Sequence, residues 1–232
     1  MNVPFLRISG LRTLLPLLLL TLPALGANIR VVMTVDNSYA LFYGSSTTAT
    51  HFVGSDFDWT TTETYDFTLP GTQYLYVVTA SDRAAAQGFL GQFENLDNGS
   101  KFYSQDPQWE VMATGLGSAA PYTGSAADLN LLSTEIGKAN INFNPSGGWV
   151  AFTAGPGNVA APWGTRPGID AAAKWVWYSS NGDLDPTTPG FDHEEWLVFR
   201  IQVGATAVPE PGTFALAGLA LLCLAWLRRA SR

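Results

Sequence analysis

Short runs of alternating or β-branched residues, closed by turn dipeptides, restrict the fold of this chain more than any other sequence feature. Helical periodicity is almost absent between residues 27 and 207. Strands are predicted at Ile29–Val35, Tyr39–Tyr43, Tyr65–Leu69, Gln73–Ala80, Phe89–Phe93, Trp109–Ala113, Trp149–Thr153, Trp175–Tyr178 and Trp196–Val203. Turn residues separate them at Asp36-Asn37, Pro70-Gly71, Asn98-Gly99, Gly147-Gly148 and Asn181-Gly182. This pattern predicts one all-β domain, a sandwich or barrel, over residues 27–207.

The predicted strand Gln73–Ala80 is apolar on both of its faces. One face carries Tyr74, Tyr76 and Val78, and the other carries Leu75 and Val77. We therefore expect this strand in the middle of a sandwich rather than at its edge.

The stretch between residues 115 and 168 is rich in Gly, Ala, Pro and Ser, and we expect long loops over the sandwich there. One helix is predicted within it, at Leu129–Ile136, with Asp128 as its N-cap and Gly137 as its stop.

The N-terminal residues 1–26 have the pattern of a secretory signal peptide. Arg7 and Arg12 supply a positive segment, Leu14–Leu22 an apolar one, and Ala24–Gly26 the small residues that a signal peptidase reads. The apolar run is shorter than the roughly 20 residues of a membrane-spanning helix. Cleavage after Gly26 fits best, with Ala27 as the alternative, and the expected product is an exported protein.

The C-terminal residues 208–232 combine three unlike parts. Pro209, Glu210 and Pro211 come first, then an uncharged apolar run at 213–227, then a basic end with Arg228, Arg229 and Arg232. As a helix the run spans roughly 22 Å, which is adequate for a thin or transient transmembrane span. A plain C-terminal anchor is the alternative, but it gives no reason for the Pro-Glu-Pro triplet.

This tail resembles the PEP-CTERM sorting signal of Gram-negative bacteria. The resemblance implies recognition of Pro209, Glu210 and Pro211 by an exosortase, removal of the helix 213–227, and release at the cell surface or into the exopolysaccharide matrix. It also implies transient anchoring in the inner membrane before processing.

Charge and cysteine content exclude several classes of protein. The 232 residues carry a net charge of −7, which argues against a nucleic-acid partner because phosphate binding needs clustered Lys and Arg. Five arginines lie in the two ends, so the mature part is more acidic still and would need Ca²⁺ to bridge it to an anionic polymer. The single cysteine, Cys223, lies in the apolar tail and excludes a disulfide framework or a CxxC zinc site.

The strand-rich body resembles a galactose-binding-like β-sandwich, a jelly roll, over Ile29–Glu94 and Lys174–Val203. The resemblance rests on the order of Val35–Tyr43, Tyr65–Leu69, Pro70–Val77, Gly88–Gly91, Trp175–Trp177 and Phe199-Arg200. It departs from the family at Gly44-Ser45, where an Asn-Gly hairpin is usual, and at Gln73, where an Asn is usual. Residues 95–173 match no part of the family and are expected to be a loop-rich insert.

The residues of a hydrolase are few. The mature region contains only two histidines, His51 and His193, and no G-x-S-x-G elbow. His193 lies in Asp192-His193-Glu194-Glu195, which lacks the HExxH spacing of a zinc protease. Paired carboxylates for glycoside hydrolysis have no motif in this chain. We therefore expect a non-catalytic protein without a resident cofactor.

A Ca²⁺ loop is an open alternative at Asn181, Asp183, Asp185 and Asp192. These residues occupy positions one, three, five and twelve of an EF-hand-like numbering. Pro186 stands where an EF-hand needs Gly, so a true EF-hand is rejected. A looser cation loop and an ion-free polar turn both remain, and the same two readings apply to Asp56 and Asp58.

Tryptophans are the strongest ligand-binding signal, because an exposed indole ring stacks on the C–H face of a sugar. Trp59, Trp109 and Trp163 lie beside loop-like sequence and are candidates for this role. Arg166 and Asp170 lie near Trp163 and would either bind sugar hydroxyls or tie down a loop. The core is expected to hold Trp149, Trp175, Trp177 and Trp196.

The sequence thus predicts an exported, non-catalytic surface or matrix protein that associates with exopolysaccharide. Two alternatives stay open. A purely structural surface protein would bury its tryptophans and lack a sugar site. A polysaccharide-active hydrolase would need a cleft with two carboxylates or a histidine.

Overall fold

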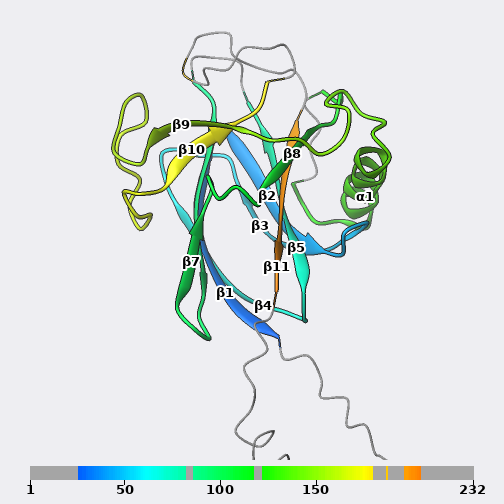
Figure 1. Cartoon of the computed structure of the whole chain (residues 1–232), viewed down its shortest axis with the longest axis horizontal. Coiled ribbons are helices and arrows are strands. Elements are labelled where there is room, and N and C mark those ends of the chain that lie inside the picture. The colour runs from blue at the N-terminus through cyan, green and yellow to red at the C-terminus, as the bar shows by residue number, and fades with distance from the viewer. Residues whose placement is uncertain (1–25, 82–85, 118–121, 180–186, 188–195, 205–232) are drawn as a thin grey trace, which may run out of the picture.

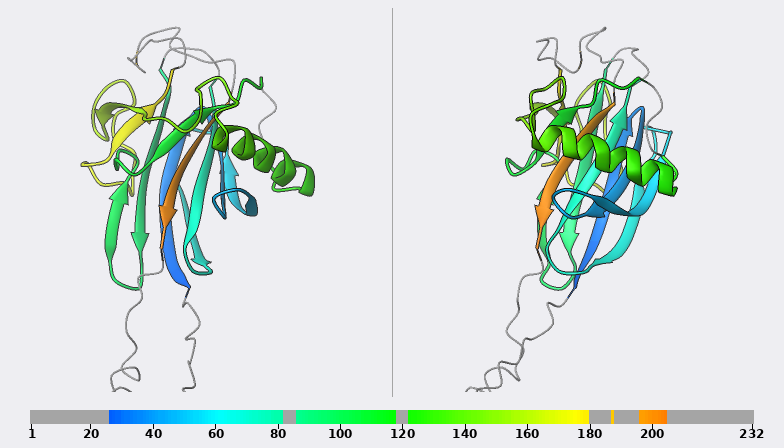
Figure 2. Two further views of the ribbon diagram at one scale, coloured as in Figure 1. Left: turned by 45° about the vertical axis from the view of Figure 1, so that its right-hand side comes forward. Right: turned by 90° about the vertical axis from the view of Figure 1, so that its right-hand side faces the viewer.

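The computed structural model describes residues 26–81, 86–117, 122–179, 187 and 196–204. Within them, strands form two antiparallel sheets that pack face to face, with a helix against the outside of one sheet (Figures 1 and 2). The predicted all-β sandwich is therefore confirmed. The jelly-roll connectivity of the galactose-binding-like family stays a prediction.

Sheet A combines strands from the N-terminal part of the chain with strands from the predicted insert. Its strand order is β4 (Glu63–Leu69), β1 (Ala27–Asp36), β6 (Gly88–Asn95), β10 (Lys174–Trp177) and β9 (Thr153–Gly157), with β7 (Ser100–Tyr103) also paired to β6. β7 pairs with Gln92–Asn95, whereas β10 pairs with β6 at Phe89. The two short strands therefore share one edge of β6.

Sheet B is the second layer. Its strand order is β3 (Ala49–Asp56), β2 (Ser38–Gly44), β5 (Gln73–Ala80), β11 (Leu197–Val203) and β8 (Glu110–Ala113). β5 is the central strand, as its two apolar faces predict.

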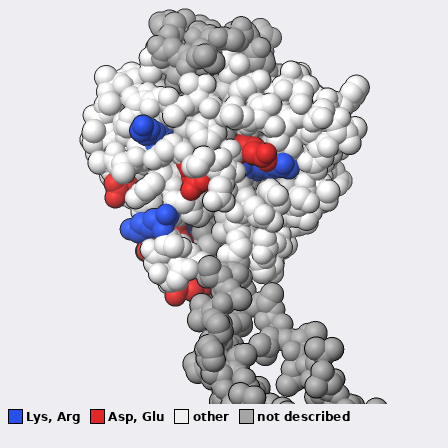
Figure 3. Space-filling view, in the orientation of Figure 1, with Lys and Arg blue, Asp and Glu red and all other residues white. Residues whose placement is uncertain are grey.

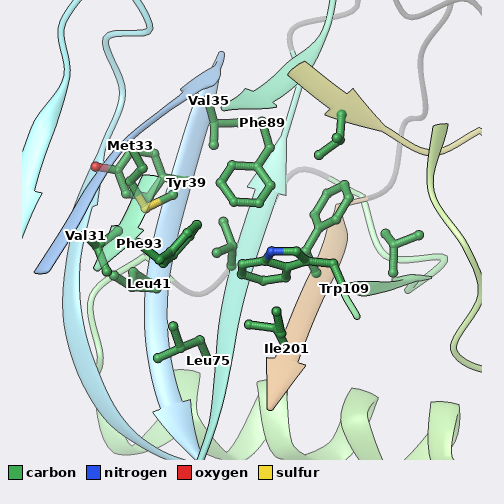
Figure 4. Close-up of a cluster of buried hydrophobic side chains, with 14 of the residues drawn as sticks. Val31, Met33, Val35, Tyr39, Leu41, Leu75, Phe89, Phe93, Trp109 and Ile201 are labelled. Atoms are coloured by element: carbon green, nitrogen blue, oxygen red, sulfur yellow. The ribbon is translucent and has the colours of Figure 1, made fainter. Parts of the chain in front are cut away.

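The sheets meet in a core of large side chains that point inward from both layers (Figure 4). Alternation along β5 sends Leu75 and Val77 into this core and sends Tyr76 and Val78 to the opposite face. Phe89 of β6 faces Phe199 of β11, with ring centres 5.4 Å apart. The inter-sheet core is thus continuous across the middle of both sheets.

The outer face of sheet B is covered by helix α1 (Ala126–Asn140), which contributes Leu132, Ile136 and Ala139 to a second apolar cluster. The helix is longer than predicted. Ser125, not Asp128, is the N-cap, because its side chain accepts from the Asp128 backbone N–H. Gly137 does not stop the helix.

The outer face of sheet A is covered by residues 158–173, which have no regular secondary structure. Trp163, Ile169 and Ala173 pack there on side chains from β1, β6 and β10. The expectation of loops over the sandwich is met by this segment, which we call the loop cover.

Residues 95–173 are more than a loop-rich insert. They supply β7 and β9 to sheet A, β8 to sheet B, and α1. The predicted strand Trp149–Thr153 is wrong: Val150 forms only an isolated bridge with Val111, and β9 starts at Thr153. β3 was not predicted at all.

The predicted signal peptide, up to residue 25, and the predicted helix 213–227 lie outside the described residues. In the part of the chain that is described, no helix is long and apolar enough to cross a membrane.

Candidate functional site

The loop between β3 and β4 brings Trp59 to the outer face of sheet A. Thr34 in β1 donates its hydroxyl to the Trp59 carbonyl at 3.0 Å. The indole ring packs at the margin of the outer cluster and is half-buried. Of the three tryptophans predicted to stack on sugars, Trp59 keeps part of its surface in solvent.

Arg166 joins the loop cover to the Trp59 loop. Its guanidinium carbon lies 5.0 Å from the centre of the Trp59 ring, a cation–π distance. Its Nη1 donates to the carbonyls of Trp59 and Thr60, at 3.3 and 2.9 Å, and its Nη2 donates to the Trp163 carbonyl. The structure therefore gives Arg166 the loop-tying role of the two that the sequence left open.

Trp163 is only 3% exposed, so the prediction that it presents a sugar-stacking face is wrong. Its ring stacks on that of Trp175, with centres 4.2 Å apart. Its Nε1 donates to the Asp36 carboxylate at 2.7 Å. Gly88 leaves the space for this pair, because a Cβ there would lie 2.6 Å from Trp175 and 3.2 Å from Trp163. Trp163 closes the loop cover onto sheet A.

Trp109 is 1% exposed, and its prediction as a sugar-stacking residue is also wrong. It precedes β8 and points into the inter-sheet core (Figure 4), where its ring centre lies 5.5 Å from that of Phe89 and 5.1 Å from that of Phe93. Its Nε1 donates to the Tyr103 carbonyl at 3.1 Å. A bonded Nε1 lets the large ring fill the core without an unsatisfied donor.

The predicted cation ligands Asn181, Asp183, Asp185 and Asp192 lie outside the described residues. The second candidate pair, Asp56 and Asp58, bonds within its own loop. Asp56 accepts from the Asp58 backbone N–H at 3.0 Å, and Asp58 accepts from the hydroxyl and N–H of Thr60. These bonds from Thr60 lower the pKa of the Asp58 carboxyl. Among the described residues, no group of three or more His, Cys, Asp or Glu has the geometry to hold a metal ion.

His51, the histidine within the described residues, stacks on Tyr43 with ring centres 4.5 Å apart. Its Nδ1 lies 2.8 Å from the Thr50 hydroxyl. His193 lies outside the described residues. His51 thus contacts the Thr50 hydroxyl and the Tyr43 ring, which indicates a packing role at the edge of sheet B.

Sequence reasoning missed a polar cluster on the outer face of sheet B. Arg200 of β11 lies with its guanidinium carbon 3.8 Å from the centre of the Trp149 ring and 5.1 Å from that of Tyr74. It also pairs with Glu110 of β8 at 2.7 Å, and both Arg200 Nη1 and Trp149 Nε1 donate to Asn140 Oδ1. The available signal was an arginine within the mostly apolar run at 196–203.

The Arg200 cluster fastens the end of α1 to sheet B and leaves little charge uncompensated. On the face that Figure 3 draws, charged groups are sparse; some acidic and basic groups touch, and others stand apart from any opposite charge. Trp149 was predicted to be in the core, but it is half-buried under Arg200. Beside it, Ile141 and Phe143 are 74% and 73% exposed.

Among the described residues, Trp59 is thus the one predicted sugar-stacking tryptophan that lies at a surface where a ligand can reach polar groups. Its chain neighbours Asp58 and Thr60 are exposed and bond each other through carboxylate and hydroxyl, and Arg166 covers part of the Trp59 ring. This arrangement suits hydrogen bonding to hydroxyl groups. The neighbouring Phe57 is 64% exposed, and its ring meets that of Tyr122 edge-on with centres 4.8 Å apart.

Comparison with known proteins identifies one segment. The model of the PEP-CTERM protein-sorting motif matches residues 207–229, which include the predicted Pro209, Glu210 and Pro211. No curated protein and no solved structure matches the chain. The matched residues begin shortly after β11, whose last residue is Val203, with residues 204–206 between them. The chain therefore carries a PEP-CTERM protein-sorting motif behind a β-sandwich body, and the motif implies export to the cell surface through an exosortase.

Proposed function

We propose that this protein is a non-catalytic component of the cell surface or of the extracellular matrix and associates there with exopolysaccharide. The observation that carries the proposal is a sorting motif that begins shortly after the last strand of a tightly packed sandwich. In this proposal the producing organism is a Gram-negative bacterium. Residues 213–227 hold the exported protein briefly in the inner membrane, and the exosortase then releases it.

The half-buried Trp59 supports the exopolysaccharide part of the proposal. A partly exposed indole, with a carboxylate and a hydroxyl on the residues next to it in the chain, provides both an apolar face and hydrogen-bond partners for a sugar. One such site binds weakly, so association would depend on many copies in the matrix acting together.

The use of carboxylates within the fold supports a non-catalytic role. Asp66 pairs with Arg30 at 2.7 Å, and Arg30 lowers the pKa of that carboxyl. Glu110 forms an ion pair with Arg200, also at 2.7 Å. Glycoside hydrolysis needs two carboxylates that face one sugar bond, one of them with a raised pKa.

Titration of the secreted protein against the producing bacterium's own exopolysaccharide, with and without Ca²⁺, tests the proposal. We expect saturable binding that weakens at least tenfold in Trp59→Ala. Phe143→Ala is the matched control, because it removes an exposed aromatic ring from the opposite side of the sandwich and should leave binding unchanged.

Two results would redirect the proposal. Absence of binding in both conditions favours the structural surface protein without a sugar site. Release of reducing ends in proportion to protein concentration favours the hydrolase. Binding that depends on Ca²⁺ would assign the cation to this protein, with Asn181, Asp183, Asp185 and Asp192 as the first residues to replace.

A further inference from the structure

The first and last strands of the described sandwich open at the same end of the molecule. Ala27 of β1 pairs with Leu69, and Val203 of β11 pairs with Gln73. Leu69 and Gln73 are the two sides of one turn, so both chain ends flank that turn. Figures 1 and 2 show the start of β1 and the end of β11 together at one end of the sandwich.

We call this end the tail-side rim and define it by residues 70–72, residues 96–99 and Gly204. A Cβ on Gly204 would lie 3.4 Å from the Thr72 hydroxyl oxygen, so the chain leaves sheet B beside the β4–β5 turn. The rim therefore surrounds the point from which the sorting motif continues.

The tail-side rim is rigidly built. Asp97 accepts from the backbone N–H and the side-chain amide of Asn28, at 2.9 and 2.7 Å, and these bonds lower the pKa of its carboxyl. The Gly99 N–H donates to the Asn95 carbonyl at 2.7 Å, closing the β6–β7 turn. Leu96 projects from this turn and is 41% exposed. Because these hydrogen bonds fix the backbone of the rim, we expect the rim to keep its conformation when another protein approaches.

The connection from the rim to the motif is short. Residues 204–208 separate Val203 from Pro209, and six Cα–Cα steps reach at most about 20 Å. An enzyme that holds Pro209–Pro211 in its active site therefore has the rim within that distance. Drawing more chain from the sandwich would break the pairing of β11 with β5, which begins at Val203 and Gln73.

We propose that the tail-side rim is the surface of this protein that lies against the exosortase during processing, and that residues 204–208 are a spacer of near-minimal length. The inference rests on exosortase processing of the motif. It adds to the proposed function a docking surface and a length requirement that lies outside the motif itself.

Pulse-chase of the full-length protein in the producing bacterium tests the length requirement. Deletion of residues 204–206 leaves the matched residues 207–229 intact and shortens the reach by about 10 Å. We expect processing to slow at least tenfold. The matched control replaces residues 204–206 by Gly-Ser-Gly, which keeps the length, and should be processed within twofold of the wild-type rate.

A photo-crosslinking residue placed at Leu96 tests the contact directly. We expect an adduct that contains the exosortase from Leu96 and none from Val159, which is 60% exposed in the loop cover. Processing of the deletion variant at the wild-type rate would overturn the proposal, as would equal adducts from both positions.

A Pro209→Ala, Glu210→Ala double variant separates this proposal from the sorting assignment. If that variant is still processed, exosortase sorting itself fails and the rim proposal falls with it. If the double variant stays unprocessed while the deletion variant is processed normally, sorting stands and only the rim proposal is overturned.

Discussion

The two sheets bury their outer faces by different means. Sheet B is covered by helix α1, whose backbone hydrogen bonds are made within the helix itself. Sheet A is covered by residues 158–173, an irregular segment whose backbone groups depend in part on side chains for hydrogen-bond partners. Asn158, Gln92, Gln105 and Thr62 supply them, by bonds to the backbone of Arg166, Asp170, Ala172 and Pro167.

This difference shows that an irregular cover requires more specific side chains than a helix does. A helix needs mainly an apolar stripe, here Leu132, Ile136 and Ala139. The loop cover needs a particular side chain at each point where its backbone meets the sheet. Single substitutions should therefore disturb the cover of sheet A more than that of sheet B.

The largest expected effect comes from Trp163→Ala in the loop cover. Loss of the buried ring should lower the free energy of unfolding by about 4 kcal/mol, and Leu132→Ala in α1 by about 3 kcal/mol. The Trp163 variant also leaves the Asp36 carboxylate without the indole N–H. Urea unfolding of the purified protein measures both changes.

Trp163→Phe is the control for the ring, since it keeps an aromatic stack on Trp175 and removes the hydrogen bond. It should cost less than Trp163→Ala. A cost below about 1 kcal/mol for Trp163→Ala would mean that the loop cover is not packed on the sheet.

The second effect separates the covers by their polar anchors. Asn158 is fully buried; its amide donates to the carbonyls of Arg166 and Ile169, and its Oδ1 accepts from the Arg166 N–H at 2.7 Å. Asn158→Ala should lower the free energy of unfolding by about 3 kcal/mol, because three buried or part-buried backbone groups lose their partner.

Ser133→Ala is the matched change on the helix side. Its hydroxyl bonds Ala49 of β3 at 3.2 and 3.4 Å, but α1 keeps its own backbone bonds without it. We expect a cost of at most about 1 kcal/mol. Equal costs for Asn158→Ala and Ser133→Ala in urea unfolding would remove the proposed difference between the two covers.

Elements with a local sequence pattern were predicted, and elements that depend on distant partners were not. β5 was predicted with its central position, because apolar residues on both faces are visible in the local sequence. β3 and β9 were missed. β3 is an edge strand with many half-exposed residues, and β9 contains two glycines and Pro156. Such strands exist because a partner pairs with them, and no local pattern carries that information.

The candidate site was predicted less well than the fold for a related reason. Trp109 and Trp163 have polar, Gly or Pro neighbours in the chain, which is typical of loops. Whether a loop tryptophan points to solvent or folds back depends on distant partners, here Phe89 and Trp175. The sorting tail, by contrast, is a contiguous signal and was recognised from sequence.

The smallest expected effect lies at the N-terminus of α1 and depends on pH. The Thr123 hydroxyl bonds the Asp128 carboxylate, as do backbone N–H groups, and together they lower the pKa of that carboxyl. A lowered folded-state pKa means that the stabilisation is present above the unfolded value of about 3.9 and is lost as the pH falls through the folded value. Asp128→Asn should therefore destabilise the protein by less than about 1 kcal/mol at pH 6. The gap from wild type should shrink at pH 3, as measured by urea unfolding at both values. A gap that is the same at both pH values would show that the charge of Asp128 does not stabilise α1. The helix cover would then depend on packing and uncharged hydrogen bonds, even at its N-terminus.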